Sequence, residues 1–404
     1  MIKITKIYFW LHLLLLTLGK YLLSYIHEYT RSHDHWHLAR GIIFTTSFMK
    51  LIICLLLSFA VFSQEKYRIS GSVKDAKSQE FIPGASVYLE STTFGTQADS
   101  LGKFGLRNIP AGRYRMVTSF VGYKPNIQFV ELLKESKTLT ITLEEDNQTL
   151  DEVRVSSKRD KTWEKQMRTF EKAFLGDSYN RKEVQILNKE VVNFEEDDDR
   201  LIATAIAPLV IENVSLGYKI TYTLDRLEKT RQLTSFRGLG RYELMHALNP
   251  RQQKRWDENR KEAYLGSLSH FLKALMDNAL EAEGYNAYLL KPGAQNTSAG
   301  RKGFFFDIST TRHFPFVATE LIKPYQGNDL FYLDTQNAIE LVYNQRRVLR
   351  PIFPDAPYPY TILIPKGLVL LSPSGNLMDP FSLEMRGDMG RIGMAELLPL
   401  DYTP

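Results

Sequence analysis

Residues 67–143 carry the pattern that most restricts the fold of this chain, a side-chain alternation of period two that recurs in one short run after another. Successive side chains of a strand point to opposite faces, so apolar residues at every second position indicate a half-buried strand. Turns rich in Gly, Pro, Asp and Ser separate the runs. Short strands at this spacing predict an antiparallel β-sandwich. The alternating sets are Tyr67, Ile69 and Val73; Ala85, Val87 and Leu89; Phe104 and Leu106; Tyr114 and Met116; Leu139, Ile141 and Leu143.

The stretch GKFGLRNIPAGRYRMVTSFVGYKP, residues 102–125, combines glycine-marked turns with aromatic side chains. Gly102 and Gly112 suit turn positions with positive φ, which glycine adopts without steric cost. Pro110 fixes the turn before Gly112. Tyr114 brings a large apolar area, and we expect it to lie between the two sheets. Its replacement by Ala is then predicted to cost about 3–5 kcal/mol.

Five spaced motifs in this region closely resemble the carboxypeptidase regulatory-like domain. They are G-x-V-x-D (Gly71–Asp75), P-G-A-x-V-x-L (Pro83–Leu89), G-T-x-x-D-x-x-G-x-F-x-L (Gly95–Leu106), I-P-x-G-x-Y (Ile109–Tyr114) and V-G-Y (Val121–Tyr123). That family has a seven-stranded, transthyretin-like or Ig-like sandwich and occurs in bacterial envelope proteins and beside metallocarboxypeptidase domains. The resemblance implies such an all-β sandwich over residues 65–145. None of the motifs carries chemistry, so it implies no site residue.

The segment before the sandwich predicts export. Residues 49–64, MKLIICLLLSFAVFSQ, have the basic start, short apolar run and small or polar end of a secretory signal peptide. Their apolar run is too short to span a membrane. Residues 1–48 do not belong to that layout, and we interpret them as a segment upstream of the true start at Met49. The alternative is a membrane anchor, because part of this segment is also apolar. The mature protein is predicted to begin near Glu65.

Cysteine content and charge agree with an exported protein that binds no nucleic acid. Cys54 is the only cysteine of the chain and lies inside the predicted signal. A mature chain without it has no disulfide and no thiol nucleophile. The formal net charge of +5 is small for 404 residues, and no long Lys/Arg block concentrates it. We therefore expect the periplasm, the outer membrane or the cell surface as the location.

A charged segment, residues 146–166, is interpreted as a linker. Within it, LDEVRV (Leu150–Val155) resembles the sequence that follows this domain in TonB-dependent outer-membrane transporters. The remaining residues lack the serial ten-residue amphipathic strands of a transporter barrel. An accessory role in TonB-dependent uptake therefore stays open as one alternative.

Residues 167–404 are predicted to form a second, α+β domain. Leu201–Leu227 reads as strands separated by Pro208 and Gly217, and strand patterns return in NAIELVYN and YTILIPKGLVLLSPSGNL. SLSHFLKALMDNALEAEGY predicts a helix capped by Ser267 and ended by Gly284. The motifs FLGDSYN, PLVIENVSLGYKI, YLGSLSHFLKAL and the terminal LLPLDYTP resemble an uncharacterised region found behind the same sandwich in envelope proteins. That resemblance implies no activity.

No combination of residues predicts a catalytic metal. A zinc peptidase needs closely spaced His and Glu ligands plus a distant His, and His246, His270 and His313 do not have that spacing. His270 is expected at the flank of its helix. The cluster HEYTRSHDHWH (His27, His33, His35 and His37) could bind a divalent metal, but it precedes the predicted start.

Other motifs of the sequence were compared with known functional motifs, and none of them predicts a site. GSLSH (Gly266–His270) lacks the second glycine of a serine-hydrolase elbow, and GLGRYE (Gly238–Glu243) lacks the third glycine of a dinucleotide-binding turn. EEDDD (Glu195–Asp199) is interpreted as a solvated hairpin, with calcium binding as the alternative. RQQKRWDENRK (Arg251–Lys261) predicts a charged helix in which Trp256 anchors a core or an interface.

These observations favour a non-enzymatic envelope protein without cofactor, catalytic residue or metal site, whose sandwich serves as an interaction or folding module. An envelope protein or a glycan is the expected partner, and membrane association is possible. The alternative from another class is a hydrolase with a carboxylate-based site in residues 167–404, because such pairs leave no local signature. A deep pocket with paired carboxylates would favour that alternative.

Overall fold

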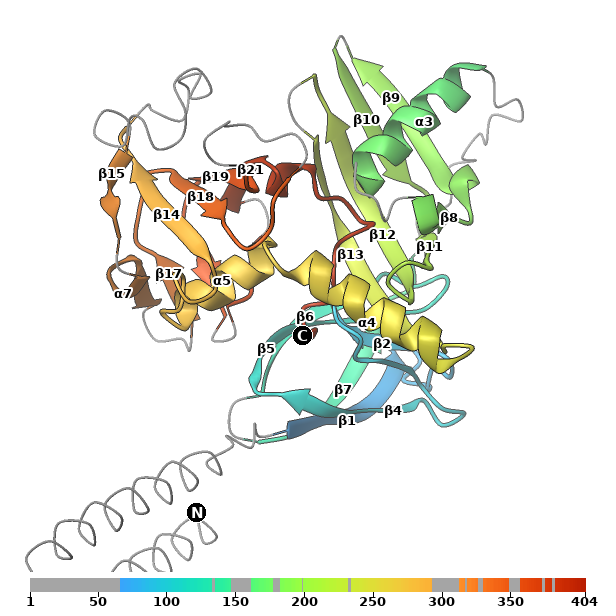
Figure 1. The fold of residues 1–404 in the computed structure, drawn as a ribbon. Helices are drawn as coiled ribbons and strands as arrows, with labels where there is room; N and C mark the ends of the chain where they lie inside the picture. Colours follow the sequence, from blue (N-terminus) through green and yellow to red (C-terminus); the bar gives the residue numbers. More distant parts are fainter. Residues whose placement is uncertain are drawn as a thin grey trace, which may run out of the picture. The chain divides into compact units, whose positions relative to one another are not determined.

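The computed structural model is mostly β-sheet with few helices (Figure 1). Residues Glu65–Pro404 form one compact unit. The predicted signal, residues 1–48 and the LDEVRV motif lie outside the described residues. The structure describes residues 66–132, 135–146, 161–176, 182–197, 199–231, 234–292, 312–316, 318–325, 330–348, 357–372, 375–379 and 382–404.

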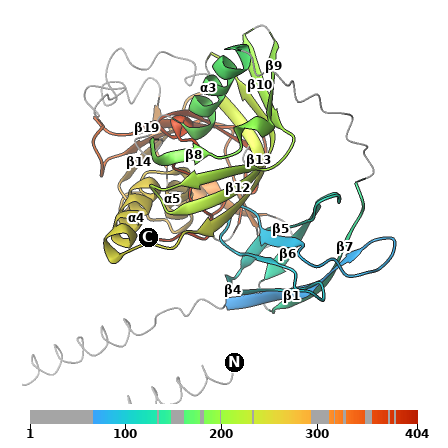
Figure 2. The same ribbon diagram turned by 90° about the vertical axis from the view of Figure 1, so that its right-hand side faces the viewer.

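The first part of this unit is a β-sandwich, as predicted (Figure 2). One sheet has the order β4-β1-β7 and the other the order β3-β2-β5-β6. All pairs are antiparallel except β1 with β7, which is parallel. The strands are β1 Lys66–Asp75, β2 Ser86–Leu89, β3 Gly95–Gln97, β4 Lys103–Pro110, β5 Gly112–Ser119, β6 Asn126–Leu132 and β7 Lys137–Leu143.

The alternating apolar residues of the sequence fill the space between these sheets. Ile69, Val73 and Val87 are fully buried in one cluster, and Met116 and Ile141 belong to the same core. The period-two pattern was therefore a correct guide to the register, because a shift of one residue would turn every one of these side chains outward.

The glycines of the sandwich serve two different purposes. Gly102 has φ +66°, as predicted for its turn. The prediction for Gly112 was wrong, since its φ is not positive and it begins strand β5. A side chain there would stand 3.3 Å from the ring of Tyr114. Gly71 is fixed by sheet pairing, because a Cβ would lie 1.9 Å from the carbonyl oxygen of Leu139.

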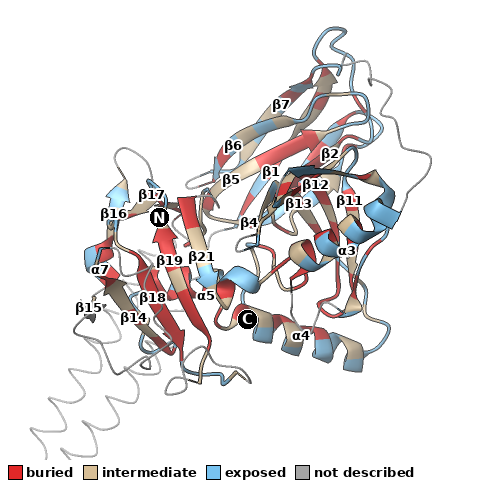
Figure 3. Ribbon diagram, turned by 90° about the horizontal axis from the view of Figure 1, so that it is seen from above, coloured by how far each residue is buried: buried red, intermediate tan, exposed pale blue. Residues whose placement is uncertain are grey.

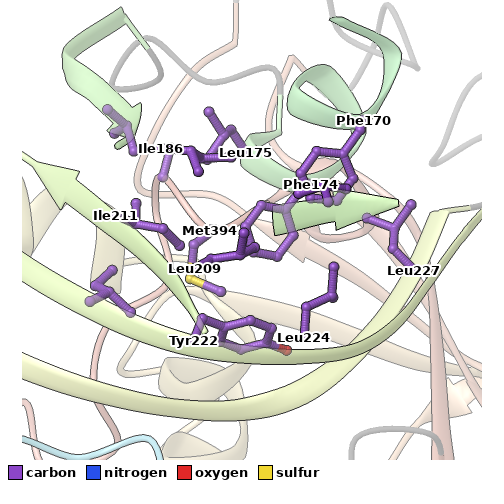
Figure 4. Close-up of a cluster of buried hydrophobic side chains, with 14 of the residues drawn as sticks. Phe170, Phe174, Leu175, Ile186, Leu209, Ile211, Tyr222, Leu224, Leu227 and Met394 are labelled. Atoms are coloured by element: carbon purple, nitrogen blue, oxygen red, sulfur yellow. The ribbon is translucent and has the colours of Figure 1, made fainter. Parts of the chain in front are cut away.

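The next part pairs helix α3 with a six-stranded antiparallel sheet. Phe170 and Phe174 of α3 stack with ring centroids 5.2 Å apart and point onto Tyr222, Leu224 and Leu227 of the sheet (Figure 4). The sheet order is β8-β11-β12-β10-β9, with β13 on β12. The elements are α3 Lys161–Leu175, β8 Val184–Ile186, the short 3-10 helix η2 Lys189–Val191, β9 Val192–Asp197, β10 Arg200–Ala205, β11 Leu209–Asn213, β12 Tyr218–Lys229 and β13 Thr234–Leu244.

Two helices follow this sheet. Helix α4 (Pro250–Tyr264) buries Trp256, as predicted, while its other residues are mostly exposed. Helix α5 (Leu268–Met276) is capped by Ser267, whose hydroxyl accepts a hydrogen bond from the His270 amide. Its predicted end at Gly284 was wrong. The helix closes eight residues earlier, where Asn278 takes the left-handed conformation with φ +53° that commonly ends helices.

The last part is a second sheet region with its own core. Strand β18 is buried along its whole length (Figure 3), and its Ile339 and Leu341 join Phe271 and Leu275 of α5 in one cluster. The sheets have the orders β15-β14-β18-β19-β21 and β16-β17-β20. The elements are β14 Tyr285–Leu290, β15 Arg312–Pro315, α7 Ala318–Leu321, β16 Ile322–Tyr325, β17 Leu330–Leu333, β18 Ile339–Tyr343, β19 Tyr360–Pro365, β20 Leu370–Leu371, β21 Leu383–Gly387 and η6 Met389–Arg391.

The C-terminal segment leaves this second sheet region and packs against α3 and its six-stranded sheet. Met394 and Ala395 lie in the core under α3. The Met394 amide donates to the carbonyl of Phe174 at 2.8 Å, and the Asn213 side-chain amide donates to the carbonyl of Ala395 at 3.0 Å. Hydrogen bonds thus hold the C-terminal segment to α3 and to the end of β11. The region is mixed in secondary structure, consistent with the α+β expectation.

Candidate functional site

One turn of the sandwich, residues 90–94 between β2 and β3, bonds to the sheet of the following region; we name it the docking turn. The Ser91 amide donates to the carbonyl of Gly240 at 2.7 Å, and the Tyr242 amide donates to the carbonyl of Thr92 at 3.1 Å. Gly240 and Tyr242 belong to β13, which pairs with β12 on its other side. The docking turn therefore occupies backbone groups of β13 that sheet pairing leaves open.

The same turn holds the C-terminal residues. The Leu400 amide donates to the carbonyl of Ser91 at 2.7 Å, and the Thr93 amide donates to the Asp401 carboxylate at 2.9 Å. The Thr93 hydroxyl donates to the other oxygen of that carboxylate. Ser91 takes the left-handed backbone conformation, with φ +56°. One turn thus joins three segments that are far apart in the sequence.

Polar groups around the docking turn are nearly all paired. Thr92 is only 1% exposed, and its hydroxyl donates to the carbonyl of Leu89 at 2.8 Å and accepts from the Phe94 amide at 3.1 Å. Glu90 forms a two-pronged ion pair with Arg115. Burial raises the pKa of the Glu90 carboxyl, and the Arg115 guanidinium opposes that effect. Polar groups that are mostly buried and have hydrogen-bond partners are typical of a stable contact between parts of a protein.

The sandwich also has exposed apolar side chains at its other loops. Val121 is 92% exposed, Leu101 59% and Phe81 48%. They follow β5, β3 and β1 respectively, at the strand ends opposite to the docking turn.

A second polar cluster surrounds His270, which is 3% exposed. Its Nδ1 accepts from the Gly266 amide at 3.1 Å and lies 3.0 Å from the Tyr285 hydroxyl. A backbone amide can only donate, so the imidazole proton sits on Nε2 and is donated to the Glu283 carboxylate at 3.1 Å. The expected place at a helix flank was wrong, because rings of Tyr264, Tyr285 and Tyr343 surround the imidazole.

A cavity of about 320 Å³ lies beside this cluster. Tyr285 and Tyr343 form part of its wall, and burial raises the pKa of both hydroxyls. Both tyrosines therefore stay protonated at neutral pH and are poor nucleophiles. The lining is completed by Gly266, Leu341, Arg346, Val348, Pro359, Thr361, Asp388, Met389, Arg391, Ile392 and Glu396.

The structure separates the three histidines of the sequence analysis by environment. Both ring nitrogens of His270 already have partners. His246 is exposed in the segment after β13. His313 lies in β15, and its side chain is outside the described part of the chain. Among the described side chains, no group of three or more His, Cys, Asp or Glu could hold a metal ion.

Two other motifs of the sequence analysis, GLGRYE and EEDDD, lie in or next to strands of the six-stranded sheet. GLGRYE lies within strand β13, where Gly238 allows close packing because a Cβ would stand 2.2 Å from the carbonyl oxygen of Thr223. In the EEDDD segment, Glu195, Glu196 and Asp197 end β9, which pairs antiparallel with β10, as predicted for a hairpin; Arg200 is bonded to Asp197 at 2.7 Å, and residue 198 lies outside the described residues. Among the described residues, none of the helices is long and apolar enough to cross a membrane.

Comparison with known families identifies the sandwich. Residues 69–155 match the model of the CarboxypepD_reg-like domain. The chain carries a CarboxypepD_reg-like domain. The match extends through LDEVRV, beyond the last strand of the sandwich at Leu143. The search of curated proteins gave no match.

Solved structures resemble only a small part of the chain. The pilin BcpA of Bacillus cereus is 15% identical over 20% of this chain and 30% of its own, with a TM-score of 0.18. The pilus 2b backbone protein of group B streptococcus is 15% identical over 20% and 41%, with a TM-score of 0.18. Catechol 1,2-dioxygenase from an Acinetobacter species is 11% identical over 20% and 53%, with a TM-score of 0.18. The chain spans less than two-thirds of each protein, and likeness of this extent says nothing about function.

Proposed function

We propose that the chain is a non-enzymatic, exported protein of the cell envelope in which the CarboxypepD_reg-like domain serves as an interaction and folding module. The observation that carries this proposal is the docking turn, which bonds β13 and the C-terminal residues at once. A module that only linked two independent parts would not need backbone pairing with a sheet edge. The domain thus completes the region behind it.

The contacts of the docking turn are strong enough for this role. Three backbone hydrogen bonds join it to Gly240, Tyr242 and Leu400. Each contributes about 0.5–1.5 kcal/mol net. The bonds that Thr93 donates to the Asp401 carboxylate involve a charged acceptor and contribute about 1.5–3 kcal/mol each. Loss of a single one of these bonds is therefore measurable against the stability of an ordinary domain, about 5–15 kcal/mol.

Hydrogen exchange on the purified protein tests this proposal. Asp401→Ala removes the acceptor of both Thr93 bonds, and we expect exchange of β13 and of residues 394–402 to rise by about tenfold for each 1.4 kcal/mol lost. Thr96→Ala is the matched control, because the Thr96 hydroxyl has only a long bond of 3.4 Å to a neighbouring carbonyl. If Asp401→Ala left exchange in β13 as in the control, the domain would not support that sheet.

Export and partners are proposed on the sequence. The signal layout of residues 49–64 supports a mature start near Glu65, and N-terminal sequencing of protein from the cell envelope should recover that residue. Recovery of residues from 1–48 would contradict it. An envelope protein or a glycan remains the proposed partner, with membrane association possible and no nucleic acid. The exposed Phe81, Leu101 and Val121 support an apolar contact area for a protein partner.

A hydrolase is the second candidate, and one observation favours it. Asp388 and Glu396 line the same cavity, as a carboxylate-based site would require. Asp388, however, already accepts a hydrogen bond from the Tyr360 amide at 2.7 Å. Hydrolysis of a panel of esters and glycosides by the protein, lost in Glu396→Gln, would establish this alternative. Elemental analysis that found stoichiometric zinc would also contradict the non-enzymatic proposal. A role beside TonB-dependent uptake has no further support.

A further inference from the structure

The charged residues that line the cavity beside His270 differ in whether they have an interaction partner. Four charged residues line it, Arg346, Arg391, Asp388 and Glu396. One Asp388 oxygen accepts from the Tyr360 amide, and the other lies 4.0 Å from Arg391. Glu396 also has an interaction partner. Among the described residues, Arg346 is the lining charge for which no ion pair is found.

Arg346 is one of the residues that line the cavity. It follows strand β18, directly after the segment that carries Tyr343. Burial raises the pKa of the Tyr343 hydroxyl and that of Tyr285, and the charge of Arg346 acts on both in the opposite direction. Arg346 and both tyrosines line the same cavity, and Arg346 itself is exposed.

The rest of the wall is mainly apolar or aromatic. Leu341 and Met389 are at most 5% exposed, and Ile392 packs against the same core. The ring centroids of Tyr285 and Tyr343 are 5.1 Å apart, and the two rings are tilted by 47° to each other. Besides Asp388, Arg391 and Glu396, the wall thus offers apolar side chains and one guanidinium for which no ion pair is found among the described residues. A guanidinium beside apolar groups can orient an organic anion.

The size of the cavity limits the ligand. At about 320 Å³, it lies at the lower end of small-molecule pockets, which measure about 300–1,000 Å³. That space suits a single ring or a short aliphatic chain. It does not suit a polymer segment or a nucleotide.

We propose that this cavity binds a small organic carboxylate, with the carboxylate on the guanidinium of Arg346 and an aromatic or short aliphatic group against Tyr343 and Met389. The site is independent of the docking turn, so it goes beyond the role proposed for the sandwich. No bond is made or broken in the ligand. The function is recognition.

Calorimetric titration of the purified protein with four probes tests the ligand class. Phenylacetate and hexanoate contain both the charge and the apolar group, and at least one of them is expected to bind. Phenylacetamide keeps the shape without the charge, and inorganic phosphate keeps charge without an apolar group. Both are expected to bind at least tenfold more weakly. Preference for phenylacetate over hexanoate assigns an aromatic ligand, and the reverse assigns an aliphatic one.

Two variants connect binding to the named residues. Arg346→Gln should weaken binding of the carboxylate at least tenfold, whereas Arg347→Gln, the neighbouring exposed arginine that does not line the cavity, should not. Val348→Trp, at another residue that lines the cavity, should remove binding by filling the space. An unchanged melting temperature of Arg346→Gln shows that the fold is intact. Equal binding by the amide, binding by phosphate alone, absence of binding by both carboxylates, or equal effects of both arginine variants would overturn the proposal.

Discussion

Gly217 offers the sharpest test of the packing in this chain. It follows strand β11 in a loop with φ +68°. A Cβ at this position would lie 2.3, 2.5 and 2.7 Å from three atoms of the Trp256 ring. Such distances are far below van der Waals contact, so Gly217→Ala forces either the ring or the loop to move.

Neither the ring nor the loop has room to move. Trp256 is 1% exposed, and its indole nitrogen donates to the carbonyl of Val214 at 2.7 Å. Arg260, one turn further along α4, donates from Nε to the carbonyl of Leu216 at 2.7 Å. Any shift of the ring away from residue 217 therefore breaks or bends buried hydrogen bonds on both sides of it.

The expected cost has two parts. The left-handed backbone conformation costs a residue with a side chain about 1–2 kcal/mol. Overpacking of a close-packed core costs about 1–3 kcal/mol more. Gly122→Ala is the matched control, because Gly122 has φ +83° and nothing within 4 Å of the added Cβ. That variant should show only the conformational part.

Urea unfolding followed by far-ultraviolet circular dichroism gives both free energies. We expect Gly217→Ala to lower the free energy of unfolding by about 1–3 kcal/mol more than the control does. In a Trp256→Leu background the excess should shrink, because the smaller side chain leaves space for the new methyl group. Equal losses for the two glycine variants, or an excess that persists without the indole, would refute the reasoning.

Two further predictions concern the sandwich. Tyr114 is half-buried, packs against the core from its margin and donates its hydroxyl to the carbonyl of Pro110 at 2.9 Å. Tyr114→Ala is therefore expected to lower the free energy of unfolding by about 3 kcal/mol, the lower end of the range for aromatic deletions. Tyr114→Phe should lower it by about 1 kcal/mol, and chemical denaturation measures both. A wild-type melting curve for the alanine variant would mean that the register is misassigned. Asp75 has a pKa held below its ordinary 3.8, first by the Ser78 amide and then by the Tyr123 hydroxyl. A carboxyl whose pKa is lower in the folded than in the unfolded protein stabilises the fold at a pH above its unfolded pKa, and this stabilisation is lost as the pH falls through its folded pKa. Wild type should therefore lose more stability than Asp75→Asn when the pH is lowered from about 5 to about 3. Equal losses in unfolding experiments would contradict this.

Local pattern was enough to predict the sandwich and several elements behind it. Period-two alternation placed Ile69, Val73 and Met116 in a core, because each strand needs only one apolar face to be recognised. The Ser267 cap of α5 was equally readable, since the cap bond spans only three residues. The early end of that helix at Asn278 was signalled by a residue type that tolerates positive φ, but the more familiar Gly284 outweighed it.

Only the tertiary structure decided which residues form sites. The docking turn joins Thr93 to Asp401 and Ser91 to Gly240, and no local pattern connects positions that are so far apart in the sequence. The position of His270 could not be predicted either, because a polar residue at a helix start looks the same in solvent as beneath three tyrosine rings. Arg346 has no distinguishing neighbour in the sequence. Short-range patterns encode which face of an element is buried, whereas sites depend on long-range contacts that form only when the elements pack.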